Sequence, residues 1–153
     1  MTPQSNLVIN AVIRPGAQED LETLLVSMNQ TDHPGMADPK NALLPFGKFG
    51  KIHFARFVIV DDQTLKDFAC AKLDVPSYPV TLVFMVDCDG SGDALLADLI
   101  GNAKAAAGLR RVFQHCVGFE KSPDLLTFMK QHRIKPAAPY VNWIGRSVAQ
   151  VHK

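Results

Sequence analysis

Residues 80–100, VTLVFMVDCDGSGDALLADLI, contain the change of hydrophobic period that decides the fold. Residues 80–86 form the longest apolar stretch of the chain, and they predict a buried strand over residues 80–87. Leu95, Leu96, Leu99 and Ile100 then recur at helical spacing, which predicts a helix that runs to about Ala107 and stops at Gly108. A strand that passes through a short turn into a helix is therefore the expected local structure.

Strand patterns recur at residues 7–13 (LVINAVI), 51–61 (KIHFARFVIVD) and 111–119 (RVFQHCVGF). Helical spacing predicts one main helix over residues 18–30 and a short helix over residues 64–75. The resulting order is strand, helix, strand, strand, helix, strand. This is the order of a ferredoxin-like βαββαβ unit, an α+β fold with one antiparallel sheet and helices on one face.

The C-terminal part predicts an extra helix. Ser122, Pro123 and Asp124 form a helix start, because Ser caps well and Pro suits the first helical position. The expected organisation is a ferredoxin-like domain over residues 1–121, followed by a helix and tail over residues 122–153. This second part either packs on the domain or leads to a further region, and whether the chain is one domain of a longer protein stays open.

The Pro- and Gly-rich residues 31–50 predict a long loop, which is either a plain surface excursion or the cover of a site. The strands themselves suggest a partner. Residues 7–13 and 80–86 are apolar on both faces, whereas a sheet with one solvated face alternates apolar and polar residues. We therefore expect the open face to be covered by a second copy of the chain or by the C-terminal segment.

The strand–helix order over residues 6–119, together with HFARFVIVDD (53–62) and DCDGSGDALLADLI (87–100), resembles uncharacterised bacterial members of the dimeric α/β-barrel superfamily. The resemblance implies a homodimer in which two sheets face each other around a cavity for a small apolar ligand. The superfamily includes small monooxygenases and the haem-binding chlorite dismutases and dye-decolourising peroxidases. It therefore implies, as an alternative, a haem-dependent peroxidase-like or small monooxygenase-like oxidoreductase.

Dye-decolourising peroxidases carry a G-x-x-D-G motif whose Asp assists peroxide cleavage. Asp89 and Gly90 match its last two positions, whereas Val86 stands in place of the first Gly. The resemblance thus implies a catalytic role for Asp89, and the departure at Val86 puts that role in doubt.

His53 is a candidate haem ligand or general base, and its alternative is a histidine satisfied within the strand. Strand alternation places it with Ala55, Phe57 and Ile59, and places Arg56 on the opposite face. The two side chains can therefore serve one catalytic pocket only if a bulge intervenes. The alternative for Arg56 is an ion pair on the strand.

His115 is the second candidate haem ligand. In a strand it would share a face with Phe113 and Val117, which suits haem or a flat aromatic ligand but equally suits a plain core. The neighbouring Cys116 would point the other way, so the two do not form a nucleophile–base pair.

Asp87, Asp89, Ser91 and Asp98 have nearly the spacing of a calcium loop, with Gly92 at the turn. The preceding strand, the short Asp98 carboxylate and Ala94 argue against a calcium-stabilised module. The alternative is a glycine turn in which Asp89 or Ser91 caps the following helix.

Composition limits the remaining possibilities. The chain has 153 residues, 47% hydrophobic residues and a formal net charge of +1, which predicts a globular domain without a nucleic-acid partner. The longest apolar run is too short to cross a membrane, and residues 1–6 do not resemble a signal peptide. Three widely spaced cysteines predict reduced, buried thiols in a cytoplasmic protein.

Overall fold

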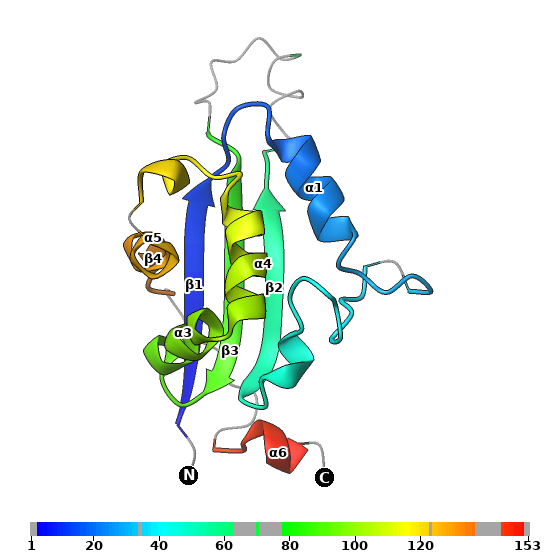
Figure 1. Ribbon diagram of the computed structural model, residues 1–153, viewed down its shortest axis with the longest axis vertical. Helices are drawn as coiled ribbons and strands as arrows, with labels where there is room; N and C mark the ends of the chain where they lie inside the picture. The colour runs from blue at the N-terminus through cyan, green and yellow to red at the C-terminus, as the bar shows by residue number, and fades with distance from the viewer. Residues whose placement is uncertain are drawn as a thin grey trace.

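The computed structural model describes residues 3–33, 35–62, 70, 78–122, 124–136 and 145–151. They form a four-stranded antiparallel sheet and five α-helices, which confirms the expected α+β class (Figure 1). The strands are β1 (Gln4–Val12), β2 (Ile52–Val60), β3 (Thr81–Asp89) and β4 (Arg133–Ile134). The α-helices are α1 (Gln18–Val26), α3 (Gly92–Gly101), α4 (Ala103–Phe113), α5 (Leu125–Gln131) and α6 (Val148–Val151), and short 3-10 turns are η1 (Phe46–Lys48) and η2 (Phe119–Lys121).

The strand order in the sheet is β2-β3-β1-β4, and every neighbouring pair is antiparallel. The central strands β1 and β3 pair along their whole length, from Gln4↔Asp89 to Val12↔Thr81. The edge strand β4 is short and pairs Val8 with Ile134. An ion pair of 2.7 Å between Arg133 Nη1 and Asp93 Oδ1 joins β4 to the first turn of α3.

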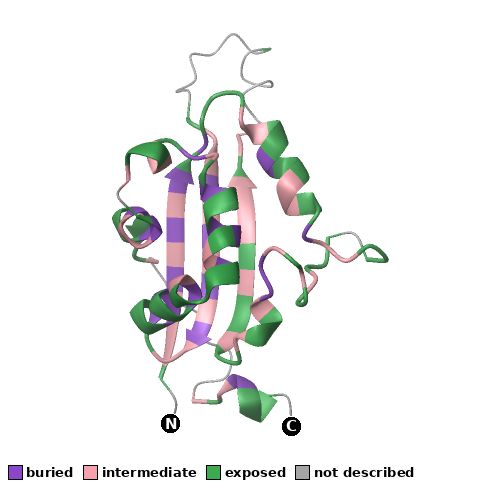
Figure 2. Ribbon diagram, viewed as in Figure 1, coloured by how far each residue is buried: buried purple, intermediate pink, exposed green. Residues whose placement is uncertain are grey.

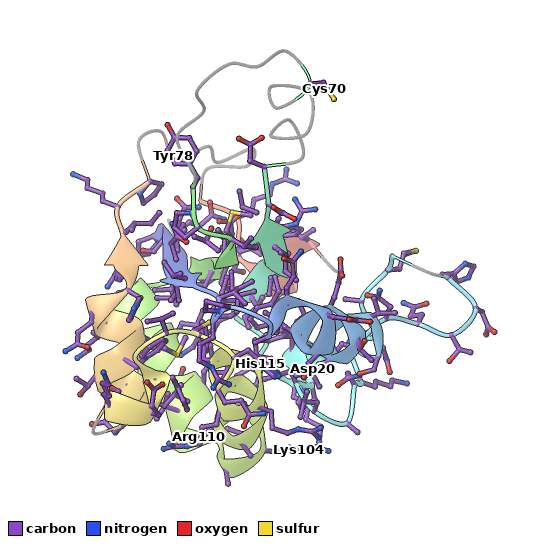
Figure 3. The ribbon with its side chains drawn as sticks, turned by 90° about the horizontal axis from the view of Figure 1, so that it is seen from above. Asp20, Cys70, Tyr78, Lys104, Arg110 and His115 are labelled. Atoms are coloured by element: carbon purple, nitrogen blue, oxygen red, sulfur yellow. The ribbon has the colours of Figure 1, made fainter. Side chains whose placement is uncertain are left out.

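One face of the sheet carries the helices α1, α3, α4 and α5, as the view along the sheet shows (Figure 3). In β1 and β3 every second residue is buried, which is the alternation expected when one face meets a core (Figure 2). The residues that point toward the helices are Leu7, Ile9, Ala11, Leu82, Phe84, Val86 and Cys88. We call the opposite surface of the sheet the open face, and among the described helices only α6 meets it, at one end.

A chain of aromatic rings runs through the core between the sheet and the helices. The Phe84 ring of β3 stacks on Phe57 of β2 at a centroid distance of 4.6 Å and meets Phe113 of α4 edge-on at 6.4 Å. Phe113 in turn contacts Phe128 of α5 at 5.7 Å. These contacts join the sheet to two helices through one continuous apolar cluster.

The predicted fourth strand over residues 111–119 is wrong. Its first three residues end α4, and Cys116 forms only an isolated bridge with Ile13. The helical signal was present in the spacing of the buried side chains, which are Ala105, Leu109, Val112, Phe113 and Cys116. The β-branched and aromatic residues at 112 and 113 suggested a strand, but packing of one helical face against the core decided the structure. The fourth strand is instead β4, which follows α5.

The single helix predicted over residues 95–107 is two helices. Asn102 adopts an extended conformation, and its side chain accepts a hydrogen bond of 3.0 Å from the Ala105 amide, so it caps α4. Gly108 does not end the helix but lies buried within α4. A Cβ atom at Gly108 would lie 2.3 Å from the Leu43 carbonyl oxygen, so glycine allows the loop to approach the helix.

Other helix predictions need smaller corrections. The helix α1 ends at Val26 rather than near residue 30, because the Met28 and Asn29 backbones hydrogen-bond to the loop that follows. The cap of α5 is Asp124 rather than Ser122, and its carboxylate accepts from the Thr127 amide at 2.8 Å. The expected helix over residues 64–75 lies outside the described residues, except for Cys70. The tail that follows α5 contains a further short helix, α6.

Candidate functional site

The polar residues at one end of the open face form the candidate site, and a β-bulge creates it. The register of β2 shifts between Ile52, which pairs with Cys88, and Phe54, which pairs with Asp87. The shift leaves His53 without a pair and rotates it out of strict alternation. The prediction that His53 shares a face with Ala55, Phe57 and Ile59 is therefore wrong, since its imidazole meets side chains of the open face instead.

His53 and Asp89 form a close pair across the two strands. Nε2 of His53 lies 2.8 Å from Oδ1 of Asp89, and the side chains are 22% and 11% exposed. The side-chain nitrogen of Gln4 lies 3.2 Å from the same ring nitrogen. The site thus brings together side chains from β1, β2 and β3, separated by up to 85 positions in the chain (from Gln4 to Asp89).

The same cluster binds the C-terminal segment. The Val148 amide at the start of α6 donates to Oδ2 of Asp89 at 2.9 Å, and the Gln4 side chain donates to the Arg146 carbonyl at 2.8 Å. Both carboxylate oxygens of Asp89 are therefore engaged. The sequence predicted Asp89 and His53 as site residues but missed Gln4 and the backbone of Arg146 and Val148, because nothing in their spacing indicates that the chain returns to this end of the sheet.

Arg56, the third predicted catalytic residue, lies further along β2. Its guanidinium carbon sits 5.4 Å from the centre of the Phe54 ring, a cation–π contact on the open face. The alternative prediction of an ion pair for Arg56 has no counterpart within the described residues. Because of the bulge, Arg56 and His53 share the open face after all.

The four predicted calcium ligands have four different partners. The Asn6 amide donates to the Asp87 carboxylate, and Asp89 binds His53. Ser91 caps α3 by accepting from the Ala94 amide at 3.1 Å, and Asp98 pairs with Lys51 at 3.1 Å. Within the described ranges, no three acidic, histidine or cysteine side chains come together in a group that could hold a metal ion. Residues 87–98 instead form the alternative structure, a glycine turn followed by a helix that Ser91 caps. Gly90 takes a φ of +83° in that turn.

His115 does not lie in a strand, and it does not share a face with Phe113 and Val117, because Phe113 is buried in α4 and Val117 is 46% exposed. It follows α4, and its Nδ1 lies 3.1 Å from the Val112 carbonyl oxygen. Figure 3 shows it on the helix-bearing side of the sheet, near Asp20 in that view. The structure therefore separates the two candidate haem ligands.

The three cysteines are free thiols, as expected, but only Cys88 and Cys116 are buried, while Cys70 is exposed. Burial raises the pKa of Cys116 to about 12 and is also the main cause of the raised pKa of Cys88. Neither buried thiol is activated as a nucleophile.

A cavity of about 460 Å³ lies on the other side of β2 from β3, and the sequence indicated it only through the alternative that residues 31–50 cover a site. Its walls come from the second half of α1, residues 35–46 and the middle of β2. The long loop over residues 31–50 is thus more than a surface excursion, since Leu44 is buried and the loop closes the cavity. The Pro- and Gly-rich composition was the one signal for it.

No helix in the described part of the chain has the length and apolar character needed to cross a membrane. Comparison with known proteins finds no matching family model, no matching curated protein and no matching solved structure.

Proposed function

We propose that this chain is a ferredoxin-like domain whose function is to associate with a second copy of itself through the open face. The strand order β2-β3-β1-β4 and the antiparallel pairing support the ferredoxin-like interpretation. The short β4 and the three helices between β3 and β4 depart from the simplest βαββαβ unit.

The observation that carries the proposal is the apolar centre of the open face. By strand alternation this face presents Val8 of β1, Val58 of β2, and Val83 and Met85 of β3. Around them, large exposed hydrophobic side chains of the same face are Val12, Phe54, Val60 and Ile134. Exposed apolar side chains gathered on one face are unfavourable in water, and such a group is typical of an interaction site.

A second copy of the chain suits this surface for two reasons. A two-fold axis brings the same surface of each copy together, so that apolar side chains meet apolar side chains. The face also carries both signs of charge, with Arg56 on β2 and Asp87 on β3, so it can be complementary to itself.

The proposed dimer encloses a space between its two sheets. Facing sheets pack about 10 Å apart and enclose an apolar space, and a small apolar ligand in that space is the second part of the proposal.

Sedimentation or light scattering over a concentration series from about 1 μM to about 100 μM tests the association, since this range covers moderate affinities. We expect a dimer for the natural chain and a monomer for Val83→Lys, because the substitution places a charge at the centre of the interface. Val26→Lys is the matched control, because Val26 is exposed at the end of α1, on the helix-bearing side of the sheet. A natural chain that stays monomeric throughout, or a dimer that Val83→Lys leaves unchanged, would contradict the proposal.

One observation favours a second candidate, a haem-dependent peroxidase-like or monooxygenase-like oxidoreductase. The bulge places His53 and Arg56 on one face, as a shared catalytic pocket requires. Asp89 occupies Nε2 of His53 and leaves Nδ1 as the ring nitrogen for a ligand. A haem titration should then give a saturable Soret band that His53→Ala removes and His115→Ala retains. The absence of a saturable band, or a band that His53→Ala leaves intact, would remove this candidate.

A further inference from the structure

The cavity beside β2 has the size of a small-molecule site. Its volume of about 460 Å³ falls within the usual range for such sites, and three separate parts of the chain line it. Hydrogen bonds hold the loop wall in place, from the Asp38 amide to the Met28 carbonyl at 3.0 Å and from the Gln30 amide to the Met36 carbonyl at 2.7 Å. The contact of Leu43 and Leu44 with Gly108 of α4 anchors the same wall to the core.

One part of the cavity wall is apolar and partly aromatic, and the rest is polar. Phe46 and Phe57 lie with ring centroids 6.3 Å apart, and Phe57 stacks on the core residue Phe84. Aliphatic side chains complete this surface, namely Leu25, Met28, Leu44 and Ile59. Such walls fit a flat apolar group better than a sugar or another strongly hydrated molecule.

The charges around the cavity favour a cation. Glu22 of α1 and Asp38 of the loop both line it, and the cavity lies at the C-terminal half of α1, whose last turn has no basic residue. The helix dipole adds negative potential at that end. The one guanidinium in the lining, Arg56, is held against the Phe54 ring on the open face.

We propose that this cavity binds a small organic cation, an amine carried on a flat aromatic body. The aromatic part lies against Phe46 and Phe57, and the ammonium group lies between Glu22 and Asp38. The site lies along the outer side of β2, and its other walls, the second half of α1 and residues 35–46, are not part of the open face.

Calorimetric titration with three indole compounds, which share the ring and a two-carbon chain and differ in the charge of the terminal group, tests the proposal. The probes are tryptamine as the cation, tryptophol as its neutral counterpart and indole-3-propionate as the anion. We expect saturable tryptamine binding with a Kd below about 1 mM. Tryptophol should bind at least tenfold more weakly, and the anion should not bind. Backbone amide chemical shifts should change at residues 55–59.

Two variants separate charge recognition from folding. Glu22→Gln should weaken tryptamine binding about fivefold to tenfold and leave tryptophol binding unchanged. Glu19→Gln, on the same helix but outside the cavity lining, is the matched control and should bind as the natural chain does. Binding of none of the three probes, equal affinity for tryptamine and tryptophol, a preference for the anion, or an unchanged tryptamine affinity in Glu22→Gln would each overturn the proposal.

Discussion

At the scale of single residues, burial decides what the titratable groups can do. Cys116 follows α4 and is completely buried beside Ile13, at the end of β1, and its pKa is raised to about 12. The folded chain therefore keeps the proton on this thiol over a pH range in which the unfolded chain loses it. The resulting stabilisation is complete below the pKa of the unfolded thiol, about 9, and is lost as the pH rises toward 12.

We expect the free energy of unfolding to fall between pH 9 and pH 12, in part because of Cys116. Urea unfolding at several alkaline pH values measures the slope, which a single thiol can steepen by up to about 1.4 kcal/mol per pH unit. In Cys116→Ala the same slope should be shallower, although the variant is less stable overall because it leaves a small cavity. Identical slopes in the two proteins would show that Cys116 does not contribute.

Gly108 gives a second prediction at this scale. Replacing a helical glycine by alanine normally favours the helix by about 1 kcal/mol. At Gly108 the new methyl group would meet the Leu43 carbonyl at 2.3 Å, and backbone atoms cannot easily move aside. We therefore expect Gly108→Ala to lower the free energy of unfolding by about 1–3 kcal/mol, as overpacked cores do.

Gly101→Ala is the control for Gly108→Ala. Gly101 is the exposed last residue of α3, and a Cβ atom there would have no neighbour within 4 Å. Its substitution should leave stability unchanged or slightly improved in the same unfolding assay. If both variants lose stability equally, close packing of the loop on α4 is not the cause.

At the scale of elements, the chain uses side chains of one element to hold the end of another. Asn102 ends α3 and begins α4, Asp124 begins α5, and Asp89 of β3 binds the first amide of α6. The backbone amide of Thr127 is the main cause of the lowered pKa of Asp124. Each contact satisfies a donor that the helix itself leaves free.

The contact between Asp89 and Val148 can be tested by hydrogen exchange. In Asp89→Ala we expect the Val148 amide to exchange at least tenfold faster, since it loses its acceptor and α6 has only four residues. Asp87→Ala is the matched control, because Asp87 binds Asn6 and does not contact α6. Unchanged protection of Val148 in Asp89→Ala would show that other contacts hold the C-terminal segment.

At the scale of the whole molecule, one apolar cluster joins the sheet to the helices. Phe84 lies at its centre, is completely buried and contacts rings from β2, α4 and the turn η1. Loss of this ring should therefore weaken all layers of the fold together rather than one element.

We expect Phe84→Ala to lower the free energy of unfolding by about 3–5 kcal/mol while the transition stays cooperative. Phe54→Ala removes a ring of the same kind from the exposed open face and should cost about 1 kcal/mol or less. Chemical denaturation followed by circular dichroism compares the two. A small effect of Phe84→Ala would mean that the cluster repacks around the missing ring.

The periodicity of the sequence was sufficient to predict the α+β class, three of the strands, and the approximate positions of α1 and α3. Those elements depend on which neighbouring residues are apolar, and that information is local. The turn at Gly90 and the cap at Ser91 were also predictable, because glycine conformation and capping act within a few residues.

The other features of the fold and of the candidate site were decided by the tertiary structure alone. Residues 111–119 carry both helical and strand signals. Packing against the core favours the helical turn, because it places Val112, Phe113 and Cys116 on one buried side. The bulge at His53 reversed the face of a candidate site residue, since a shift of one position exchanges the two faces of a strand. The Gln4–His53–Asp89 cluster and the cavity beside β2 bring together distant parts of the chain. Such contacts depend on how the elements pack, and local sequence does not encode them.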